Sequence, residues 1–264
     1  MDYYANENNL YPTCEFLKDF TFLNNTKINY YLSPIFKKNN FIHAFFTKES
    51  ANIDVYSQGN QLIRNNHNNC IIKQIHSDDI AFTSELNSQR IMIADGLICD
   101  NKNQNLWIYT ADCMPILFAD KSQRRIAAVH CGRIGLEKNI ICKLIKSFEL
   151  MGSSRKDIIV SIGPSISGNN YLLDQKTYCN FFSTQNSFSM KIIKKNNLFN
   201  KFNEHKLISL DIKKYAYLQL LRENIDPNNV EVSNKCTYSL PVEFHSWRRS
   251  KNDYRQWSVI CTSI

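Results

Sequence analysis

The chain has 264 residues, of which 43% are hydrophobic, so it carries enough apolar surface for a globular core and is not intrinsically disordered. No run approaches about 18 apolar residues, so no membrane span is predicted, and the polar, acidic N-terminus does not resemble a secretory signal. The net charge of +8 is spread along the chain, which favours a solvated basic surface over a nucleic-acid groove.

Short apolar runs in the first part of the chain predict buried strands, because they are bounded by polar residues or turn signals. The runs are FIHAFFT (41–47), CIIKQIHS (70–77), LWIYTA (106–111), PILFAD (115–120), RRIAAVHCG (124–132) and DIIVSIGPS (157–165). The chain is expected to break its strand near Pro115, since proline cannot donate to a central ladder.

Three later segments predict helices. Residues 135–152 place Ile140, Leu144, Ile145 and Phe148 on one stripe, with Gly152 following the helix end. Residues 209–227 place Ile212, Tyr215, Leu218 and Leu221 on one face, and 174–185 is a weaker candidate. Strand signals return at 229–239 and 256–262. Strands mixed with helices predict α/β layers.

Three metal-binding side chains fall where strand-like runs stop: His76, Cys113 and His130. In the run 126–131 side chains alternate, so His130 shares a face with Ile126 and Ala128, whereas Cys131 points the other way and is expected to pack. Three protein ligands with an open fourth position are typical of catalytic zinc. The spacing is loose, however, and a buried thiol and core histidines explain the same residues.

Six segments in order make the chain resemble a known family. They are KQIHS, ADGLICD, TADCMPILFAD, AAVHCGRIGL, IGPSI and CTYS…FHSWRR…QWSVI, and the match as a whole runs from about His43 to Ile260. They resemble the laccase-domain family, once called multicopper polyphenol oxidases and now regarded as zinc-dependent purine nucleoside phosphorylases.

The resemblance implies a single domain over residues 1–264, with an irregular N-terminal extension at 1–25. The implied fold is α/β (α+β), a layered α/β/β/α sandwich with mixed sheets. The implied cofactor is Zn²⁺ held by His76, Cys113 and His130, with copper less favoured because one such site lacks the several centres of copper oxidases. The implied activities are phosphorolysis of adenosine, inosine and methylthioadenosine, and adenosine deamination.

The chain departs from the family pattern at three places. The turn after His130, usually AGWRG, reads CGRIG here, so the tryptophan is absent and Arg133 comes one place early. A Gly-Gly-Val-Ser loop is missing after HAFFT, and Asn169–Leu172 replace the paired cysteines and Tyr-Glu that follow IGPSI. These changes affect the expected substrate pocket more than the metal ligands.

Phosphorolysis requires a cationic clamp for phosphate, and guanidinium groups match two phosphate oxygens at once. Arg248 and Arg249 are the first candidates, followed by Arg133 and Arg255, and Gln74 is the neighbour of His76 expected to share its side. Asp95 and Asp112, together with Cys113, are the candidate catalytic residues, although aspartates at strand ends often cap turns. Tyr171 and Phe46 are aromatic candidates for which core packing is the simpler explanation.

Two other functions fit the same residues. Cys113 could act as a metal-free nucleophile with His76 or His130 as its base, on an amide such as a peptidoglycan precursor. Alternatively, the protein could retain zinc as a non-catalytic binder.

Nine cysteines without a secretory signal predict free thiols in a reduced, cytoplasmic protein. The expected partners are a purine nucleoside and phosphate, with no nucleic acid or membrane, and the oligomeric state is left open.

Overall fold

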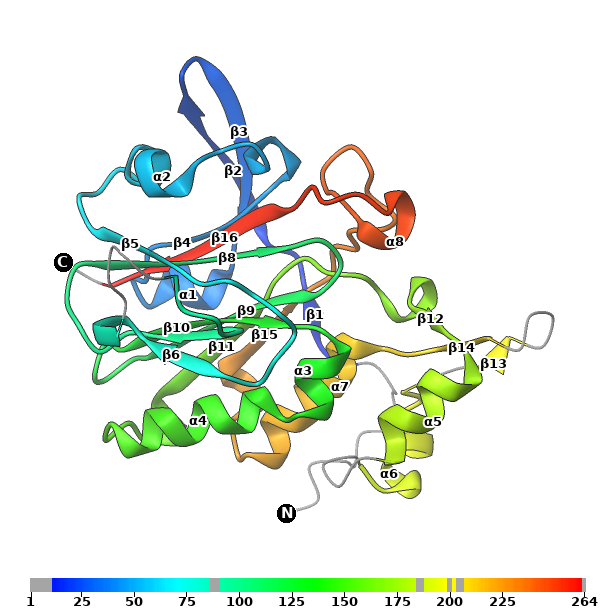
Figure 1. Ribbon diagram of the computed structural model, residues 1–264. Helices are drawn as coiled ribbons and strands as arrows, with labels where there is room; N and C mark the ends of the chain where they lie inside the picture. The colour runs from blue at the N-terminus through cyan, green and yellow to red at the C-terminus, as the bar shows by residue number, and fades with distance from the viewer. Residues whose placement is uncertain (1–10, 86–90, 184–187, 199–200, 203–206, 263–264) are drawn as a thin grey trace.

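Two β-sheets packed face to face form the centre of the protein, as the computed structural model shows (Figure 1). The structure describes residues 11–85, 91–183, 188–198, 201–202 and 207–262. A buried cluster that includes Phe45, Leu106, Leu117 and Ile159 fills the space between the sheets. Because each sheet buries this face against the other, the remaining faces have to be covered by other elements.

The first sheet has six strands in the order β2-β3-β4-β16-β8-β5. Its strands are β2 (Leu17–Leu23), β3 (Thr26–Leu32), β4 (His43–Phe46), β5 (Asn68–Ile71), β8 (Gln104–Thr110) and β16 (Gln256–Cys261). All pairs are antiparallel except β5 with β8. The central strand β4 is buried along its whole length, which confirms the buried strand predicted from FIHAFFT.

The second sheet has seven strands in the order β1-β15-β11-β9-β10-β7-β6. Its strands are β1 (Thr13–Cys14), β6 (Ile80–Phe82), β7 (Gly96–Ile98), β9 (Met114–Asp120), β10 (Ile126–Cys131), β11 (Ile158–Ile162) and β15 (Val230–Ser233). Parallel and antiparallel pairs both occur, so the sheet is mixed. A small third sheet joins β12 (Leu172–Leu173), β13 (Lys201–Phe202) and β14 (Leu207–Ser209).

Helices cover both outer faces, which confirms the expected α/β/β/α layering. Helices α3, α4, α5 and α7 pack their apolar side chains on the seven-stranded sheet, while α2 lies over the six-stranded sheet (Figure 1). The helices are α1 (Pro34–Lys38), α2 (Val55–Ile63), α3 (Arg133–Glu137), α4 (Ile140–Leu150), α5 (Gln175–Ser183), α6 (Met190–Lys195), α7 (Ile212–Arg222) and α8 (Trp247–Ser250). Single 3₁₀ turns lie at Lys48–Ser50, Thr83–Glu85, Arg155–Asp157, Gly168–Asn170 and Pro227–Asn229.

Side-chain alternation in β10 follows the sequence prediction. Ile126 and Ala128 face the other sheet, whereas Ala127, Val129 and Cys131 face the helical layer. Cys131 is fully buried, as expected for a packing residue. His130 therefore emerges on the side of Ala128, at the end of the strand, where the space between the two sheets opens.

The helix expected over 135–152 is two helices. The break lies at Asn139, which adopts a left-handed conformation (φ 64°) before α4. Asparagine tolerates this conformation better than most residues, so it can occupy the break. The apolar periodicity did not reveal the break, because Asn139 is not one of the apolar positions. Gly152 has φ +90°, and the N–H of Ser153 bonds the carbonyl of Phe148, so the predicted helix end is confirmed.

Two expectations for the strands were wrong. Residues 1–25 do not form an irregular extension where they are described, because β1 and β2 lie within 11–25 and β2 pairs with β3 along seven residues. Pro115 does not break a strand but is the second residue of the central strand β9. Its carbonyl accepts from the N–H of Gly163, and its place near the strand end limits the cost of the missing donor.

The helices of the described residues were compared with the length and apolar character of a membrane-spanning helix. None of these helices has both the length and the apolar character that crossing a bilayer requires.

The packing of the two sheets leaves no room for a side chain at Gly163, which follows β11. A Cβ there would overlap the ring of Phe45 and lie 2.9 Å from Pro115 Cγ. We expect Gly163→Ala to lower the free energy of unfolding by about 1–3 kcal/mol, the usual cost of overpacking a core. Chemical denaturation measures this change.

The control is the same substitution in a Phe45→Leu background, where the ring is gone. The effect of Gly163→Ala should shrink there, because residues in contact are energetically coupled. Equal costs in both backgrounds would contradict the proposed overlap.

Candidate active site

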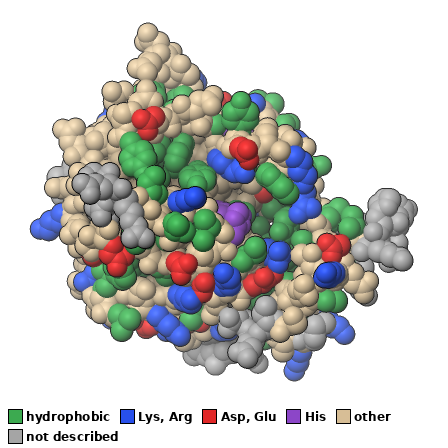
Figure 2. Space-filling model, viewed as in Figure 1, with side chains coloured by type: hydrophobic (Ala, Val, Ile, Leu, Met, Phe, Trp, Pro, Cys, Tyr) green, Lys and Arg blue, Asp and Glu red, His purple; other side chains and the backbone are tan. Residues whose placement is uncertain are grey.

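A cavity of about 490 Å³ opens at the end of the sandwich where the predicted site residues meet. In the space-filling view a histidine side chain lies within a hollow bordered by hydrophobic and basic side chains (Figure 2). This volume is within the range of small-molecule sites. The lining residues are Gln74, His76, Tyr109, Thr110, Ala111, Asp112, Cys113, His130, Arg133, Ile134, Ile166, Tyr171, Ile212, Trp247, Arg248 and Arg255.

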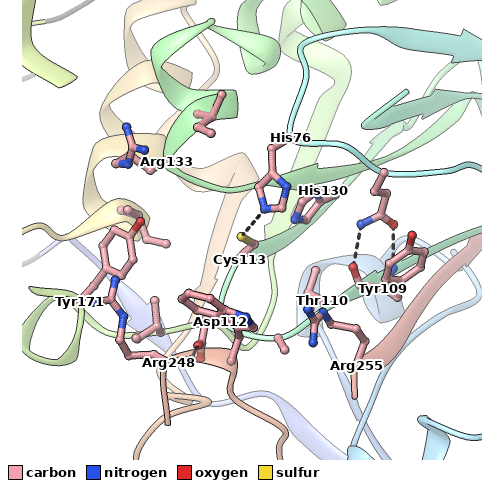
Figure 3. A pocket seen from close by; sticks show the side chains of 16 residues that line it. His76, Tyr109, Thr110, Asp112, Cys113, His130, Arg133, Tyr171, Arg248 and Arg255 are labelled. Atoms are coloured by element: carbon pink, nitrogen blue, oxygen red, sulfur yellow. Dashed lines mark hydrogen bonds between the residues drawn. The ribbon is translucent and has the colours of Figure 1, made fainter. Parts of the chain in front are cut away.

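His76, Cys113 and His130 come together on one side of this cavity (Figure 3). One potential ligand atom from each lies within 4.8 Å of the other two, and Cys113 Sγ is 3.7 Å from His76 Nε2. The centres of the two imidazole rings are 4.7 Å apart, and the rings are nearly perpendicular. The structure thus joins three residues that are far apart in the sequence.

The carboxylate of Asp95 organises two of these side chains. It accepts a bond of 2.7 Å from His130 Nδ1, which leaves His130 Nε2 free to bind a metal. The same carboxylate accepts the backbone N–H groups of Ile75, His76 and Ser77. Burial raises the pKa of Asp95, but the bonds from His130 and Ser77 outweigh it and lower the pKa to about 2. Asp95 does not line the cavity, so its contacts are those of a positioning residue.

His76 was expected at the end of a strand, but it does not lie there. Strand β5 ends at Ile71, and His76 follows in a turn with a left-handed backbone (φ 62°). The N–H bonds to Asp95 hold this turn, which is why a non-glycine residue can adopt it. His76 is also exposed, whereas His130 is buried, so the cluster is open toward the cavity.

Cys113 has the character of a thiolate in this surrounding. Burial raises the pKa of its thiol, but the imidazoles of His130 and His76 outweigh burial and lower it to about 6. Burial alone would lower the pKa of His130, yet Cys113 and Asp95 raise it to about 9. Sulfur and nitrogen groups with these properties are suited to bind a metal ion or to form a thiolate–imidazolium pair.

Gly132 keeps space free beside the sulfur. A Cβ at this position would lie 2.7 Å from Cys113 Sγ and 3.4 Å from His76 Cδ2. No other residue type fits here without displacing the cluster. The CGRIG turn stands out in the sequence, but no role was expected for this glycine; the available signal was its position two residues after His130.

The cluster fits a transition metal that prefers nitrogen and sulfur ligands. In a tetrahedral site with bonds of about 2.0–2.3 Å, neighbouring ligand atoms are roughly 3.5 Å apart. The observed separations require only small side-chain rotations to reach this. Three ligands and an exposed side toward the cavity leave a fourth position for a reactant.

Asp112 is engaged with the backbone and side chains around it. Its carboxylate accepts from Thr237 Oγ1 (2.7 Å), Ser246 Oγ (3.0 Å) and the N–H of Arg248 (2.6 Å). Its backbone has φ 92°, a conformation that costs about 1–3 kcal/mol unless surrounding contacts fix it. These contacts give Asp112 a positioning role, because they tie the segment before α8 to the turn that carries Cys113.

Gln74 lines the cavity, but its amide is fully paired with one residue. Its Nε2 donates to the carbonyl of Tyr109, and its Oε1 accepts from the N–H of the same residue. Gln74 thereby continues the pairing of β5 with β8 beyond the end of β5. Its expected contact with substrate would need this pairing to open.

Arginine and tyrosine side chains surround the cluster, with Arg133, Tyr171 and Arg248 on one side and Tyr109 and Arg255 on the other (Figure 3). The guanidinium of Arg248 lies 4.9 Å from the centre of the Tyr171 ring and donates one bond to the carbonyl of Leu172. Its Nε is buried and has no partner among the described residues. Arg133 pairs with Glu137 one turn along α3, and Arg255 bonds the carbonyls of Asn252 and Tyr254.

Arg249 was expected to bind substrate, but it lies outside the cavity. Its guanidinium donates to the carbonyls of Thr237, Tyr238 and Phe244. These bonds hold the loop before α8 and leave no free face for a ligand. Consecutive residues at the start of a helix point in different directions, so the two neighbouring arginines have different roles.

The aromatic residues divide in the same way. Phe46 is buried on the outer face of the six-stranded sheet and packs on Trp107, so core packing is confirmed. Tyr171 instead lines the cavity together with Tyr109 and the half-exposed Trp247, neither of which the sequence analysis selected. Trp247 immediately precedes the arginines that were selected, and this adjacency was the available signal.

Comparison with known proteins gives one family. The family model described as multi-copper polyphenol oxidoreductase laccase matches residues 48–263. A purine nucleoside phosphorylase of Clostridium acetobutylicum is 31% identical over 250 residues, covering 90% of this chain and 99% of the relative. A purine nucleoside phosphorylase of Synechocystis is 29% identical over 210 residues, covering 72% and 78%.

Solved structures share the fold. The hypothetical protein YfiH of Bacillus licheniformis aligns with a TM-score of 0.77 at 21% identity, over 89% of this chain and 96% of that one. YlmD of Geobacillus stearothermophilus aligns with a TM-score of 0.73 at 19% identity, with the same coverages. These likenesses support the layered architecture described above.

We expect the purified protein to bind about one transition-metal ion per chain at the His–Cys–His cluster. Cys113→Ala should remove most of this binding, because it deletes the only sulfur ligand of the three. Elemental analysis after dialysis measures the metal content. Cys131→Ala is the matched control, since Cys131 is a neighbouring buried thiol on the opposite face of β10. Equal metal content in both variants would contradict the assignment.

Proposed function

Because the chain belongs to the multi-copper polyphenol oxidoreductase laccase family, whose matched relatives are named purine nucleoside phosphorylases, we propose that it is an enzyme that cleaves purine nucleosides with phosphate. In this reaction a phosphate oxygen forms a bond to C1′ of the ribose while the bond from C1′ to the base nitrogen breaks. The base leaves with a proton as a free purine, and ribose 1-phosphate is the second product.

The observation that carries this proposal is the state of Arg248. Its buried Nε lacks a partner in the described chain, and the residue lines the same cavity as the His–Cys–His cluster. The Nε atom itself is closed off from the cavity, so an anion there would be bound by the terminal nitrogens of the guanidinium, one of which also donates to the carbonyl of Leu172. Guanidinium groups bind phosphate oxygens in pairs, so we assign the phosphate to Arg248, with Arg133 and Arg255 adding positive charge.

The aromatic side chains of the cavity supply a place for the base. Tyr171, Tyr109 and Trp247 offer ring faces in a cavity of about 490 Å³. Purines bind such faces by offset or edge-on ring contacts. We assign adenosine, inosine and methylthioadenosine as substrates, and adenosine deamination as a second reaction of the same site.

We favour zinc as the ion. Two imidazoles and one thiolate with an open position are typical of catalytic zinc, whereas copper oxidation of phenols normally needs several copper centres. Zinc bound by His76, Cys113 and His130 would supply Lewis-acid charge at the cavity wall. The contribution of the chain itself is to fix His130 through Asp95 and to keep space beside Cys113 through Gly132.

We expect release of adenine from adenosine to depend on phosphate, and Arg248→Lys to lower kcat/KM by about 10²-fold or more. The reason is that lysine keeps the charge but loses the paired donors that match the reacting phosphate. A coupled assay with and without phosphate measures both effects. Arg155→Lys is the control, since Arg155 pairs with Glu149 on the surface. Phosphate-independent base release would contradict a phosphorylase.

A second candidate function rests on the lowered pKa of Cys113 beside two imidazoles. A metal-free thiolate would attack an amide carbonyl carbon, the C–N bond would break, and the amine would leave with a proton from an imidazolium. Water would then hydrolyse the thioester. Amides of peptidoglycan precursors are the substrate class for this reaction.

Alkylation separates the two candidates. In the phosphorylase, Cys113 of the protein as purified should resist iodoacetamide because a bound ion occupies the sulfur, and it should react after chelation. The exposed Cys179 is the internal reference for reagent access. Mass spectrometry of the digested protein measures both sites. Rapid alkylation of Cys113 in the protein as purified, with a loss of amide hydrolysis that matches the extent of alkylation, would favour the hydrolase.

A further inference from the structure

A second cavity lies on the outer face of the six-stranded sheet, away from the candidate active site. Its volume is about 570 Å³, and it shares no lining residue with the first cavity. Tyr30, Ala44 and Phe46 line it from β3 and β4, while β2 and the end of α2 contribute further residues. The β2–β3 hairpin, which forms one edge of this sheet, rises beside α2 (Figure 1). The cavity therefore lies in the outer layer of the sandwich.

The lining of this cavity combines apolar and aromatic side chains with polar ones. Phe41 and Phe46 are buried, Tyr30 is half-buried, and Leu62 and Ile63 of α2 add aliphatic surface. Ala44 has the smallest side chain in this group, which contributes to the depth of the hollow. A flat ring bound here would meet aromatic edges and faces.

One buried polar atom in this cavity has no partner. Thr21 is 3% exposed, and its Oγ1 forms no hydrogen bond among the described residues. Thr21 lines the cavity from β2. Buried hydroxyl groups are normally paired, and an unpaired one is explained by a ligand or water that is bound there in solution.

Two basic side chains add unused positive charge. Lys37 is the last-but-one residue of α1, Arg64 follows α2, and both line the cavity. Neither forms an ion pair with a described residue. Asp19, the one carboxylate among the lining residues, is occupied by the N–H of Phe20 and lies beside the Tyr30 hydroxyl. His43 is neutral, because burial lowers its pKa to about 4.

From these observations we infer that the second cavity binds a small organic anion with an aromatic body. The apolar and aromatic side chains of the lining contact the rings, and Lys37 and Arg64 bind the anionic group through charge-assisted bonds from their ammonium and guanidinium groups. This site is separate from the proposed nucleoside site and does not depend on the His–Cys–His cluster.

The test uses 8-anilinonaphthalene-1-sulfonate, an aromatic sulfonate whose fluorescence rises on binding in an apolar site. We expect the variant Lys37→Gln/Arg64→Asn to raise its dissociation constant at least about tenfold. Asparagine is chosen because residue 64 has a left-handed backbone (φ 55°), which asparagine accepts. Lys38→Gln is the matched control, since Lys38 ends the same helix but does not line the cavity.

The uncharged probe N-phenyl-1-naphthylamine reports on the cavity without its anion site. It should bind the wild type and the double variant with equal affinity. Ala44→Leu should lower the affinity for both probes, because the larger side chain fills the cavity. Thermal denaturation checks that the variants fold. Unchanged sulfonate affinity in the double variant, or displacement of the sulfonate by adenosine and phosphate, would overturn the inference.

Discussion

The four hydrogen bonds to the Asp95 carboxylate are the constraint on which the candidate site depends. They join the end of β10, through His130, to the turn that carries His76. A buried carboxylate that accepts this many donors remains ionised, since each bond favours the charged form. The negative charge in turn fixes His130 with Nδ1 as the donor, so that Nε2 faces Cys113. Neither histidine would keep its position without this carboxylate.

A second aspartate connects the cluster to the C-terminal part of the cavity lining. Asp112 lies next to Cys113 in the chain but bonds Thr237, Ser246 and the backbone of Arg248, all from the C-terminal part. One short segment therefore positions both a member of the His–Cys–His cluster and an arginine of the cavity. The two aspartates determine where reacting groups lie, and the arginine guanidinium and the cluster atoms are the groups that face a ligand.

Features with a local or periodic basis could be predicted from the sequence. The alternation in β10, the apolar face of α7 and the end of α4 at Gly152 follow from side-chain period and from glycine chemistry. The meeting of His76, Cys113 and His130 was suggested by their positions where strand-like runs stop and by the family resemblance. The break at Asn139 was missed because asparagine also fits within a helix pattern.

Long-range contacts set the limit of the prediction. Arg248 and Arg249 are equivalent in the sequence, and only the fold directs one to the cavity and the other to backbone carbonyls. The same holds for Gln74, whose amide pairs with Tyr109 across two strands. The outer cavity near Ala44 depends on how the β2–β3 edge of the six-stranded sheet lies relative to α2, and this arrangement is not encoded locally in the sequence.

The paths of the ligand-bearing segments have a mechanical consequence. His76 lies between β5 and β6, and Cys113 between β8 and β9, so each sits on a segment that passes from the six-stranded sheet to the seven-stranded sheet. An ion held by both would cross-link the two sheets at this end of the sandwich. Sliding of one sheet over the other would pull the ligands apart, so ion retention would report on the alignment of the two sheets.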